Sequence, residues 1–276
     1  MHPLDAATKL EIAGDKLTGA TSDAYWNFTG PFGGATAATL LQAAMQHPKR
    51  QNLPLAMTIN YCAPVAKGTF DIHVSEKRTN RSTQHFSAEM TQGTDTIATS
   101  TLVFATRPEG FAHISGKMPA VAEPEKIDPP KAKAPLAWID RFDMRFASGF
   151  PVMRPKDDAP LGSPRTEVWM RDNPLRKLDF LGLMNMSDAF FARPFHVLGR
   201  LIQVGTISMS TYFHCDEQDL AEVGDDYVLG VADANIFNKG YADQIASLWS
   251  RKGKLLATSQ QMLYFRDKAF VPGGRK

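Results

Sequence analysis

The sequence predicts an α+β protein in which one structural unit, an antiparallel sheet wrapped around a single buried helix, occurs twice in tandem. The first observation is the order of elements, because short strands, an apolar helix and four longer strands recur on either side of a proline-rich segment. The second is a local match, in which residues 97–100 and 256–259 share Ala-Thr-Ser and each precede an apolar strand ending in Phe. Internal repeats decide architecture, so we expect a duplicated unit.

The first half is organised around residues 35–47, which are rich in Ala and Leu and contain no internal Pro or Gly. This composition favours a helix, and a helix that is apolar nearly all round must be buried. Shorter strand-like pieces broken by glycines precede it between residues 8 and 28. Segments rich in Thr, Ile, Val and Phe follow, as in an antiparallel meander, at residues 53–62, 69–78, 83–91 and 96–106.

Residues 107–135 differ in composition from the segments on both sides. Repeated prolines punctuate a polar stretch that contains many Lys and Glu. Long irregular segments are uncommon inside compact domains, so this composition indicates a linker. We therefore expect an N-terminal domain over residues 1–107, a proline-rich linker over 108–135 and a C-terminal domain over 136–276.

The C-terminal half repeats the pattern of the first. Asp172-Asn173-Pro174 predicts a helix start, with an Asx N-cap and a proline at the first helical position. The Leu-, Phe- and Met-rich helix is expected to run to about Phe191. A sheet curled around one helix is the hotdog fold, so we predict two tandem hotdog domains, a double hotdog. The expected strands of this half are 138–147, 165–171, 203–214, 227–237, 242–251 and 254–265.

Composition and charge exclude several function classes. The 276 residues carry a formal net charge of only +2, with Lys and Arg spread along the chain. Phosphate binding along a polymer needs a concentrated basic face, so we expect no nucleic-acid partner. The sequence has no uncharged run of about 18 apolar residues and no secretory signal pattern. We therefore expect a cytoplasmic protein that does not insert into membranes.

The sequence contains a series of motifs in both halves, namely Trp26, Gly30-Pro31-Phe32-Gly33-Gly34, Arg78-Thr79-Asn80-Arg81-Ser82, Asp188, Gly205-Thr206-Ile207-Ser208-Met209-Ser210 and Leu255-Leu256-Ala257-Thr258-Ser259-Gln260-Gln261. Together these motifs resemble the TesB-like (acyl-CoA thioesterase II) family of double-hotdog thioesterases, and the similarity covers nearly the whole chain apart from the linker. The resemblance implies that the protein is a thioester hydrolase of lipid metabolism, with acyl-CoA as substrate, no cofactor and an Asp/Thr/Gln trio that positions water. On this resemblance the trio is Asp188, Thr206 and Gln261, and an alignment shifted by one residue would place Gln260 in the trio instead.

The residue types of the trio suit thioester hydrolysis. Asp188 is expected within the second helix among apolar residues, where an unpaired charge is costly, so it is either near the surface, paired or functional. A carboxylate can accept the proton of an attacking water, and a hydroxyl and an amide can hold that water in line. Thr206 alone would pass as an ordinary strand residue. Gln260 and Gln261 face opposite sides of their strand, so only one points at the helix.

Other residues are candidates for substrate binding. Arg78, Arg81 and Lys239 could meet the CoA phosphates, although ordinary solvated charges explain each of them better. Gly33 and Gly34 could present N–H groups to an anion at the start of the first helix, although tight packing explains glycines there equally well. No His, Cys or Asp cluster has metal-ligand spacing, so we expect no metal.

Two alternative functions stay open on the sequence. A non-catalytic acyl-CoA-binding protein would share the fold, and the intact trio argues against it. A hotdog hydratase or dehydratase would need a His base in the loop before a helix, and residues 30–34 and 172–174 contain no His. Two hotdogs can pair within one chain, so a homodimer is compatible with the sequence but is not required.

The match between the halves predicts one active site per chain. It places Thr101 opposite Gln260 and Leu102 opposite Gln261, and residues 35–47 contain no Asp or Glu. An aliphatic side chain cannot hold water, and a helix without a carboxylate cannot supply a base. We expect the first half to contribute core, edge pairing and part of the CoA groove.

Overall fold

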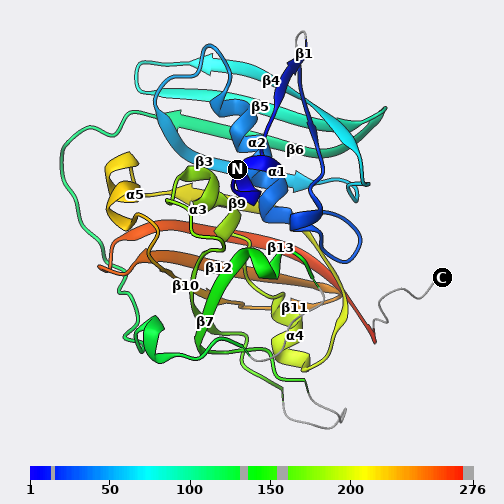
Figure 1. Cartoon of the computed structure of the whole chain (residues 1–276), viewed down its shortest axis with the longest axis vertical. Coiled ribbons are helices and arrows are strands. Elements are labelled where there is room, and N and C mark those ends of the chain that lie inside the picture. Colours follow the sequence, from blue (N-terminus) through cyan, green and yellow to red (C-terminus); the bar gives the residue numbers. More distant parts are fainter. Residues whose placement is uncertain (14–15, 131–135, 154–160, 270–276) are drawn as a thin grey trace.

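The computed structural model of the protein describes residues 1–13, 16–130, 136–153 and 161–269 (Figure 1). Within them, helices pack against one antiparallel sheet of 13 strands. The helices are α1 (Pro3–Ala7), α2 (Gly33–Met45), α3 (Phe180–Met186), α4 (Arg193–Leu198) and α5 (Glu217–Val223), with short 3-10 helices at Asp23–Tyr25, Pro124–Lys126 and Ile139–Arg141. The strands are β1 (Glu11–Ala13), β2 (Lys16–Ala20), β3 (Leu53–Tyr61), β4 (Thr69–Thr79), β5 (Thr83–Gln92), β6 (Asp95–Ala105), β7 (Phe142–Ser148), β8 (Thr166–Asp172), β9 (Ile202–Phe213), β10 (Val228–Asp233), β11 (Phe237–Asn238), β12 (Tyr241–Ser250) and β13 (Leu255–Ala269).

The strand order shows the same sheet built twice. One half runs β1-β2-β4-β5-β6-β3 from its outer edge, the other runs β7-β8-β10-β12-β13-β9, and β11 pairs with β12. The halves join through antiparallel pairing of β3 with β9, where Thr58 lies opposite Ser210 and their hydroxyl oxygens are 2.9 Å apart (Figure 1). The predicted α+β double hotdog is confirmed.

The pairing register agrees with the match seen in the sequence. Leu102 of β6 lies opposite Met57 of β3, and Gln261 of β13 lies opposite Met209 of β9. Superposing one strand pair on the other therefore places Leu102 where Gln261 lies. The alignment based on four residues thus holds along the neighbouring strand as well.

Helix α2 is the buried helix predicted for the first half. It begins at Gly33 and ends at Met45, and side chains on all its faces are buried, including Ala37, Leu40 and Ala44 at 0% exposed. Helix α3 packs against it, and one hydrophobic cluster of buried residues contains members of both helices. The two halves therefore share a continuous core.

The start of the second buried helix was predicted wrongly. Residues 172–174 lie at the end of β8 and in the loop beyond it, and α3 begins only at Phe180. Its N-cap is Asp179, whose carboxylate accepts a hydrogen bond from the N–H of Gly182 at 2.8 Å. The cap is therefore Asp179, in place of the Asx residue predicted in Asp172-Asn173-Pro174.

The end of that helix also differs from the prediction. Helix α3 stops at Met186, and the chain turns before it enters the separate helix α4. The expectation that Asp188 lies within the helix is therefore wrong, because Asp188 follows the C-cap residue Ser187 in that turn. A turn places this carboxylate at the end of α3 instead of on its side.

The later part of the expected linker, residues 118–127, packs onto the second half, whereas residues 108–117 are exposed. The indole N–H of Trp169 donates to the backbone carbonyl of Ala122 at 2.9 Å. Arg251 forms ion pairs with Glu123 and Glu125 at 2.8 and 2.6 Å. Apolar linker residues also contact the cluster of Trp169, Tyr227, Leu229 and Trp249, namely Met118, Val121 and Ile127.

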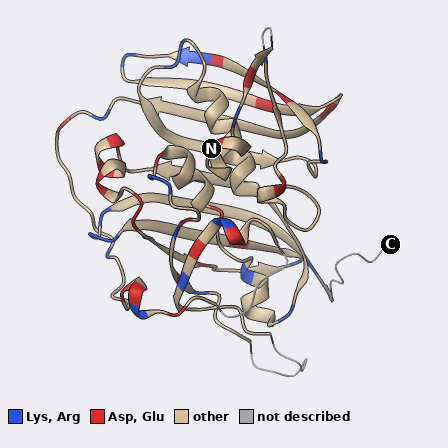
Figure 2. Cartoon of the chain, in the orientation of Figure 1, with Lys and Arg blue, Asp and Glu red and all other residues tan. Residues whose placement is uncertain are grey.

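Charged residues of both signs are distributed over the two halves (Figure 2). This distribution agrees with the small net charge and gives neither half a single sign. None of the helices in the described part of the chain is long and apolar enough to cross a membrane.

A buried carboxylate lies where the N-terminus meets the second half. Asp172 is 2% exposed, and within the described residues neither of its side-chain oxygens has a hydrogen-bond partner. Arg176 approaches it at 4.0 Å but is bound more closely to Asp5 and Asp179. Burial raises the pKa of Asp172 to about 7, and the charge of Arg176 opposes this only in part.

We predict that Asp172→Asn reduces the loss of stability at high pH. The pKa of Asp172 is higher in the folded state than in the unfolded state. Protonation of this group therefore contributes to the free energy of unfolding fully below about pH 4, and the contribution is lost as pH rises through about 7. Between pH 5 and pH 8 the free energy of unfolding of the wild type should fall by on the order of 2 kcal/mol more than that of Asp172→Asn. Thermal unfolding of both proteins at the two pH values measures this.

The matched control is Asp128→Asn in the exposed part of the linker, which should follow the wild type at both pH values. Parallel pH dependence in Asp172→Asn and the wild type would contradict the prediction.

Candidate active site

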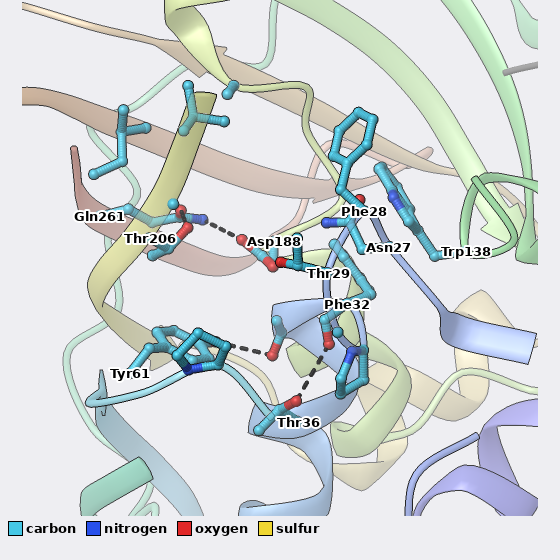
Figure 3. Close-up of a pocket in the computed structure, with 18 of the residues that line it drawn as sticks. Asn27, Phe28, Thr29, Phe32, Thr36, Tyr61, Trp138, Asp188, Thr206 and Gln261 are labelled. Carbon is cyan, nitrogen blue, oxygen red and sulfur yellow. Dashed lines mark hydrogen bonds between the residues drawn. The ribbon is translucent and has the colours of Figure 1, made fainter. Parts of the chain in front are cut away.

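A cavity of about 360 Å³ lies between the two halves (Figure 3). The first half lines it with the loop before α2, the first turn of α2, the end of β3 and the loop after β3. The second half lines it with the turn after α3, with α4 and with β9, β12 and β13. Neither half encloses this space alone, so the cavity is a product of the duplication.

Asp188 and Gln261 meet on the wall of this cavity. The turn after α3 carries Asp188, which is 9% exposed, and β13 carries Gln261, which is 3% exposed. The side-chain amide of Gln261 donates to Oδ1 of Asp188 at 2.9 Å (Figure 3). The neighbouring Gln260 is exposed, as the two-residue period of a strand requires. The structure therefore brings Gln261, and not Gln260, to Asp188.

Thr206 reaches the same wall because β9 carries a β-bulge. The pairing register of β9 with β13 shifts so that Ile207 is skipped and Thr206 lies opposite the buried Leu263. Strict alternation from the buried Met209 would have turned Ile207 inward, but Ile207 is 36% exposed. The hydroxyl of Thr206 donates to Oε1 of Gln261 at 3.4 Å. The bulge thus directs Thr206 toward Gln261.

The electrostatics of Asp188 suit proton transfer near neutral pH. Burial raises the pKa of Asp188 to about 7, while hydrogen bonds from Gln261 and from the backbone of Gly34 oppose the rise. With a pKa near neutral pH, the carboxyl group can both accept and return a proton.

The first turn of α2 approaches Asp188 closely, and this approach requires glycine. A Cβ atom on Gly33 would lie 2.8 Å from Oδ2 of Asp188, and one on Gly34 would lie 2.5 Å from the backbone carbonyl of Asn185. The N-cap residue Phe32 makes no side-chain cap hydrogen bond, and the carboxylate of the other half lies at this helix start, where the backbone of Gly34 acts on it. Of the two glycines proposed to bind substrate, Gly33 lines the cavity and Gly34 is not among the lining residues.

Aromatic side chains form another part of the wall. The rings of Phe32 and Trp138, both labelled in Figure 3, stack with centroids 4.4 Å apart. The ring of Phe191 lies 6.0 Å from that of Trp138. Phe28, on the loop before α2, lines the same cavity. An apolar wall next to a polar trio is the usual composition of a small-molecule site.

The three basic residues predicted for CoA phosphates are not brought to this cavity. Arg78, Arg81 and Lys239 are exposed, and none of them lines it. Arg78 is hydrogen-bonded to Asn80 in the turn after β4, and Lys239 lies in the turn between β11 and β12 with φ of 49°. The structure gives them no shared site.

Tyr61 was missed by sequence reasoning. It is the last residue of β3, and its hydroxyl donates to the backbone carbonyl of Gly33 at 2.8 Å on the cavity wall. A tyrosine near a strand end is ordinary by composition. Only the contact of β3 with the start of α2 distinguishes it, and the sequence carries no local signal of that contact.

The corresponding place in the first half is filled by apolar residues. Leu102, 1% exposed, takes the position of Gln261. The register of β3 with β6 has the same bulge as the second half, and the buried Pro54 takes the position of Thr206. Neither side chain can donate a hydrogen bond to water.

The space beside the start of the buried helix is also filled by apolar side chains in the second half. By the same register Tyr61 corresponds to Phe213, which has no hydroxyl. Phe213 packs edge-on against Phe180 at the first residue of α3, with ring centroids 5.5 Å apart. Where Tyr61 leaves room beside a glycine, the related position is packed with two aromatic rings.

In the parts of the chain that the structure describes, no group of three or more His, Cys, Asp and Glu side chains could hold a metal ion. The polar groups that the trio brings to the candidate site are the carboxylate of Asp188, the hydroxyl of Thr206 and the amide of Gln261.

Two family models match the chain. The acyl-CoA thioesterase N-terminal domain matches residues 22–105, and the acyl-CoA thioesterase C-terminal domain matches residues 119–265. The chain belongs to the acyl-CoA thioesterase family, which confirms the resemblance found in the sequence.

Solved structures show the same fold along the whole chain. A hotdog-fold protein of unknown function from Alicyclobacillus acidocaldarius is 39% identical, with a TM-score of 0.90 over 98% of this chain and 100% of that one. The acyl-CoA thioesterase II TesB2 from Mycobacterium marinum is 18% identical, with a TM-score of 0.75 over 95% of this chain and 98% of that one. The TesB protein of Mycobacterium avium subspecies paratuberculosis, also 18% identical, has a TM-score of 0.74 over the same shares. No curated protein matches the sequence.

Proposed function

We propose that the protein hydrolyses acyl-CoA thioesters to a free acid and CoA, with a water activated by Asp188 and positioned by Thr206 and Gln261. The observation that supports this most strongly is the hydrogen-bonded series from Thr206 through Gln261 to Asp188 on one cavity wall. Membership of the acyl-CoA thioesterase family supports the substrate class.

In the proposed reaction, Asp188 takes a proton from water while the water oxygen adds to the thioester carbonyl carbon. Thr206 and Gln261 hold the water and fix the orientation of the carboxylate. The tetrahedral intermediate then expels the CoA sulfur, which receives the proton from Asp188. The products are a carboxylic acid and the CoA thiol, and the carboxylate is restored.

The aromatic wall is the proposed contact surface for the acyl group. Phe32, Trp138 and Phe191 present apolar rings within the cavity that holds the trio. Burial of apolar substrate surface against such rings is favourable, at roughly 25 cal/mol per Å². In this proposal the N-terminal domain (1–107) and the C-terminal domain (136–276), joined by residues 108–135, share one site.

The geometry favours hydrolysis over the two alternatives. Among the described residues that line the cavity there is no histidine, which is the base that a hotdog hydratase would use. A binding protein without activity would not need a buried carboxylate on the cavity wall that is hydrogen-bonded to an amide and, through it, to a hydroxyl. Turnover of acyl-CoA, followed as release of free thiol across a panel of acyl groups, distinguishes these functions.

We predict that Asp188→Asn lowers turnover by a factor on the order of 10² to 10⁴, because the amide keeps the shape of the carboxylate but cannot accept a proton. Steady-state hydrolysis of the best acyl-CoA in the panel measures the loss. Asp225→Asn, in an exposed turn after α5, is the control and should behave as wild type. A folded Asp188→Asn protein with full turnover would show that the base lies elsewhere.

We predict that Gln261→Leu, which copies the first half, lowers turnover about 10- to 100-fold, because a hydrogen bond to a charged group is lost. Gln260→Leu changes the exposed neighbour and should leave turnover unchanged. The reverse exchange, Leu102→Gln, should destabilise the fold by about 1–3 kcal/mol through a buried amide and add no activity. Full turnover in Gln261→Leu, or a gain in Leu102→Gln, would contradict the assignment of one site.

A further inference from the structure

One peptide group connects Tyr61 to Asp188. The carbonyl of Gly33 and the N–H of Gly34 belong to the same planar peptide unit at the start of α2. The hydroxyl of Tyr61 donates to that carbonyl at 2.8 Å. The N–H at the other end of the unit is that of Gly34, a backbone donor that lowers the pKa of Asp188, and Oδ2 of this carboxylate lies close beside Gly33. The series therefore runs from Tyr61 through the Gly33–Gly34 peptide to Asp188.

Hydrogen bonds in such a series strengthen one another. A donor at the carbonyl oxygen draws electron density toward it and makes the N–H of the same unit a stronger donor, by about 10–30% per bond. A stronger N–H donor stabilises the neighbouring carboxylate when it is charged and does not stabilise it when it is protonated. A hydroxyl on Tyr61 therefore favours the ionised form of Asp188 without touching it.

We propose that Tyr61 is a positioning residue that orients and polarises the Gly33–Gly34 peptide and thereby helps to keep Asp188 ionised. Tyr61 comes from the first half and Asp188 from the second, so this inference gives the first half a part in the chemistry. It rests on the proposed function only where activity is concerned, because the state of Asp188 can be measured directly.

The surroundings leave few other groups that could act on Asp188. Among the described residues that line the cavity, the titratable ones besides Asp188 are Tyr61, Cys62 and Tyr264. Burial raises the pKa of Tyr61 well above its usual value, and the nearby Asp188 charge raises it further. The phenol therefore stays protonated and remains a donor over the working pH range. Lys and Arg are not among the described lining residues, so no cation there competes with this effect.

The duplication supplies an internal comparison. The position equivalent to Tyr61 is Phe213, and it packs against α3 without a hydroxyl. The start of α3 has its own side-chain cap, Asp179, and there the phenol is absent. The start of α2 has no side-chain cap and faces Asp188 of the other half, and there the phenol is present. The hydroxyl is thus found beside the helix start that meets Asp188.

The test is a direct titration of Asp188 by carbon NMR of labelled carboxyl groups, with the signal identified by its absence in Asp188→Asn. Tyr61→Phe should raise the pKa of Asp188 by about 0.2–0.6 unit. Replacement of Tyr61 by 3-fluorotyrosine, a more acidic phenol, should lower it. Opposite shifts from two nearly isosteric changes are not expected from a merely structural role.

Activity gives a second readout. The acid limb of the kcat/KM profile should move to higher pH in Tyr61→Phe, so that kcat/KM falls about 1.5- to 4-fold at pH 6 and returns to the wild-type plateau at high pH. Two controls lose a tyrosine hydroxyl elsewhere. Tyr212→Phe removes an exposed one, and Tyr227→Phe removes one that donates to Asp143. Neither should move the profile.

An unchanged pKa of Asp188 in folded Tyr61→Phe would overturn the inference, whatever its activity. Shifts in the same direction for Phe and 3-fluorotyrosine would also overturn it. Failure of the proposed function has a different signature, because either the wild type would not hydrolyse acyl-CoA or Asp188→Asn would remain active, while the NMR titration still reports whether Tyr61 acts on Asp188.

Discussion

The contact between the carboxylate of Asp188 and the start of α2 is the interaction on which the rest of the site depends. The helix belongs to the first half and has no side-chain cap of its own, while the carboxylate belongs to the second half. Unpaired N–H groups of a buried helix and an unpaired buried charge are each costly, and each offsets part of the other's cost. Desolvation still outweighs the hydrogen bonds, so the pKa of Asp188 stays near 7 and the group remains able to exchange a proton.

This contact also explains why a duplicated fold carries an asymmetric site. Both halves keep the same strand order and the same β-bulge, so the scaffold that presents Thr206 and Gln261 exists twice. The first half fills it with Pro54 and Leu102, which pack well and hold no water. Conversely, glycines at the start of α2 leave room for a carboxylate, whereas α3 starts at Phe180 and is packed closed. The first half thus lacks the polar side chains that the second half supplies, and the second half lacks the open helix start that the first half supplies.

The sequence predicts those features that follow from local composition. Signals within a few residues predict the apolar helix α2 and the meander of β3 to β6. They also predict that Leu102 and Gln261 are equivalent positions in the two halves. The turn that holds Asp188 is different, because the pattern predicts a helix from residues 172–174 to about Phe191, whereas the structure caps the helix at Asp179 and ends it at Met186. The helix α5, with its Asp216–Asp219 capping box, lies in a segment too polar to show a periodic pattern. The role inferred for Tyr61 depends on a contact between halves that no local pattern encodes.

The central claim is that the two halves together make one site. Calorimetric titration of the protein with a non-hydrolysable acyl-CoA thioether tests it most directly, because the number of ligands bound per chain does not depend on any assumption about mechanism. The account predicts one ligand per chain, with binding weakened by a bulky residue at Gly33, where a side chain would strike Asp188 and Tyr61. Two equivalent ligands per chain, or binding that is unaffected by that change, would contradict it.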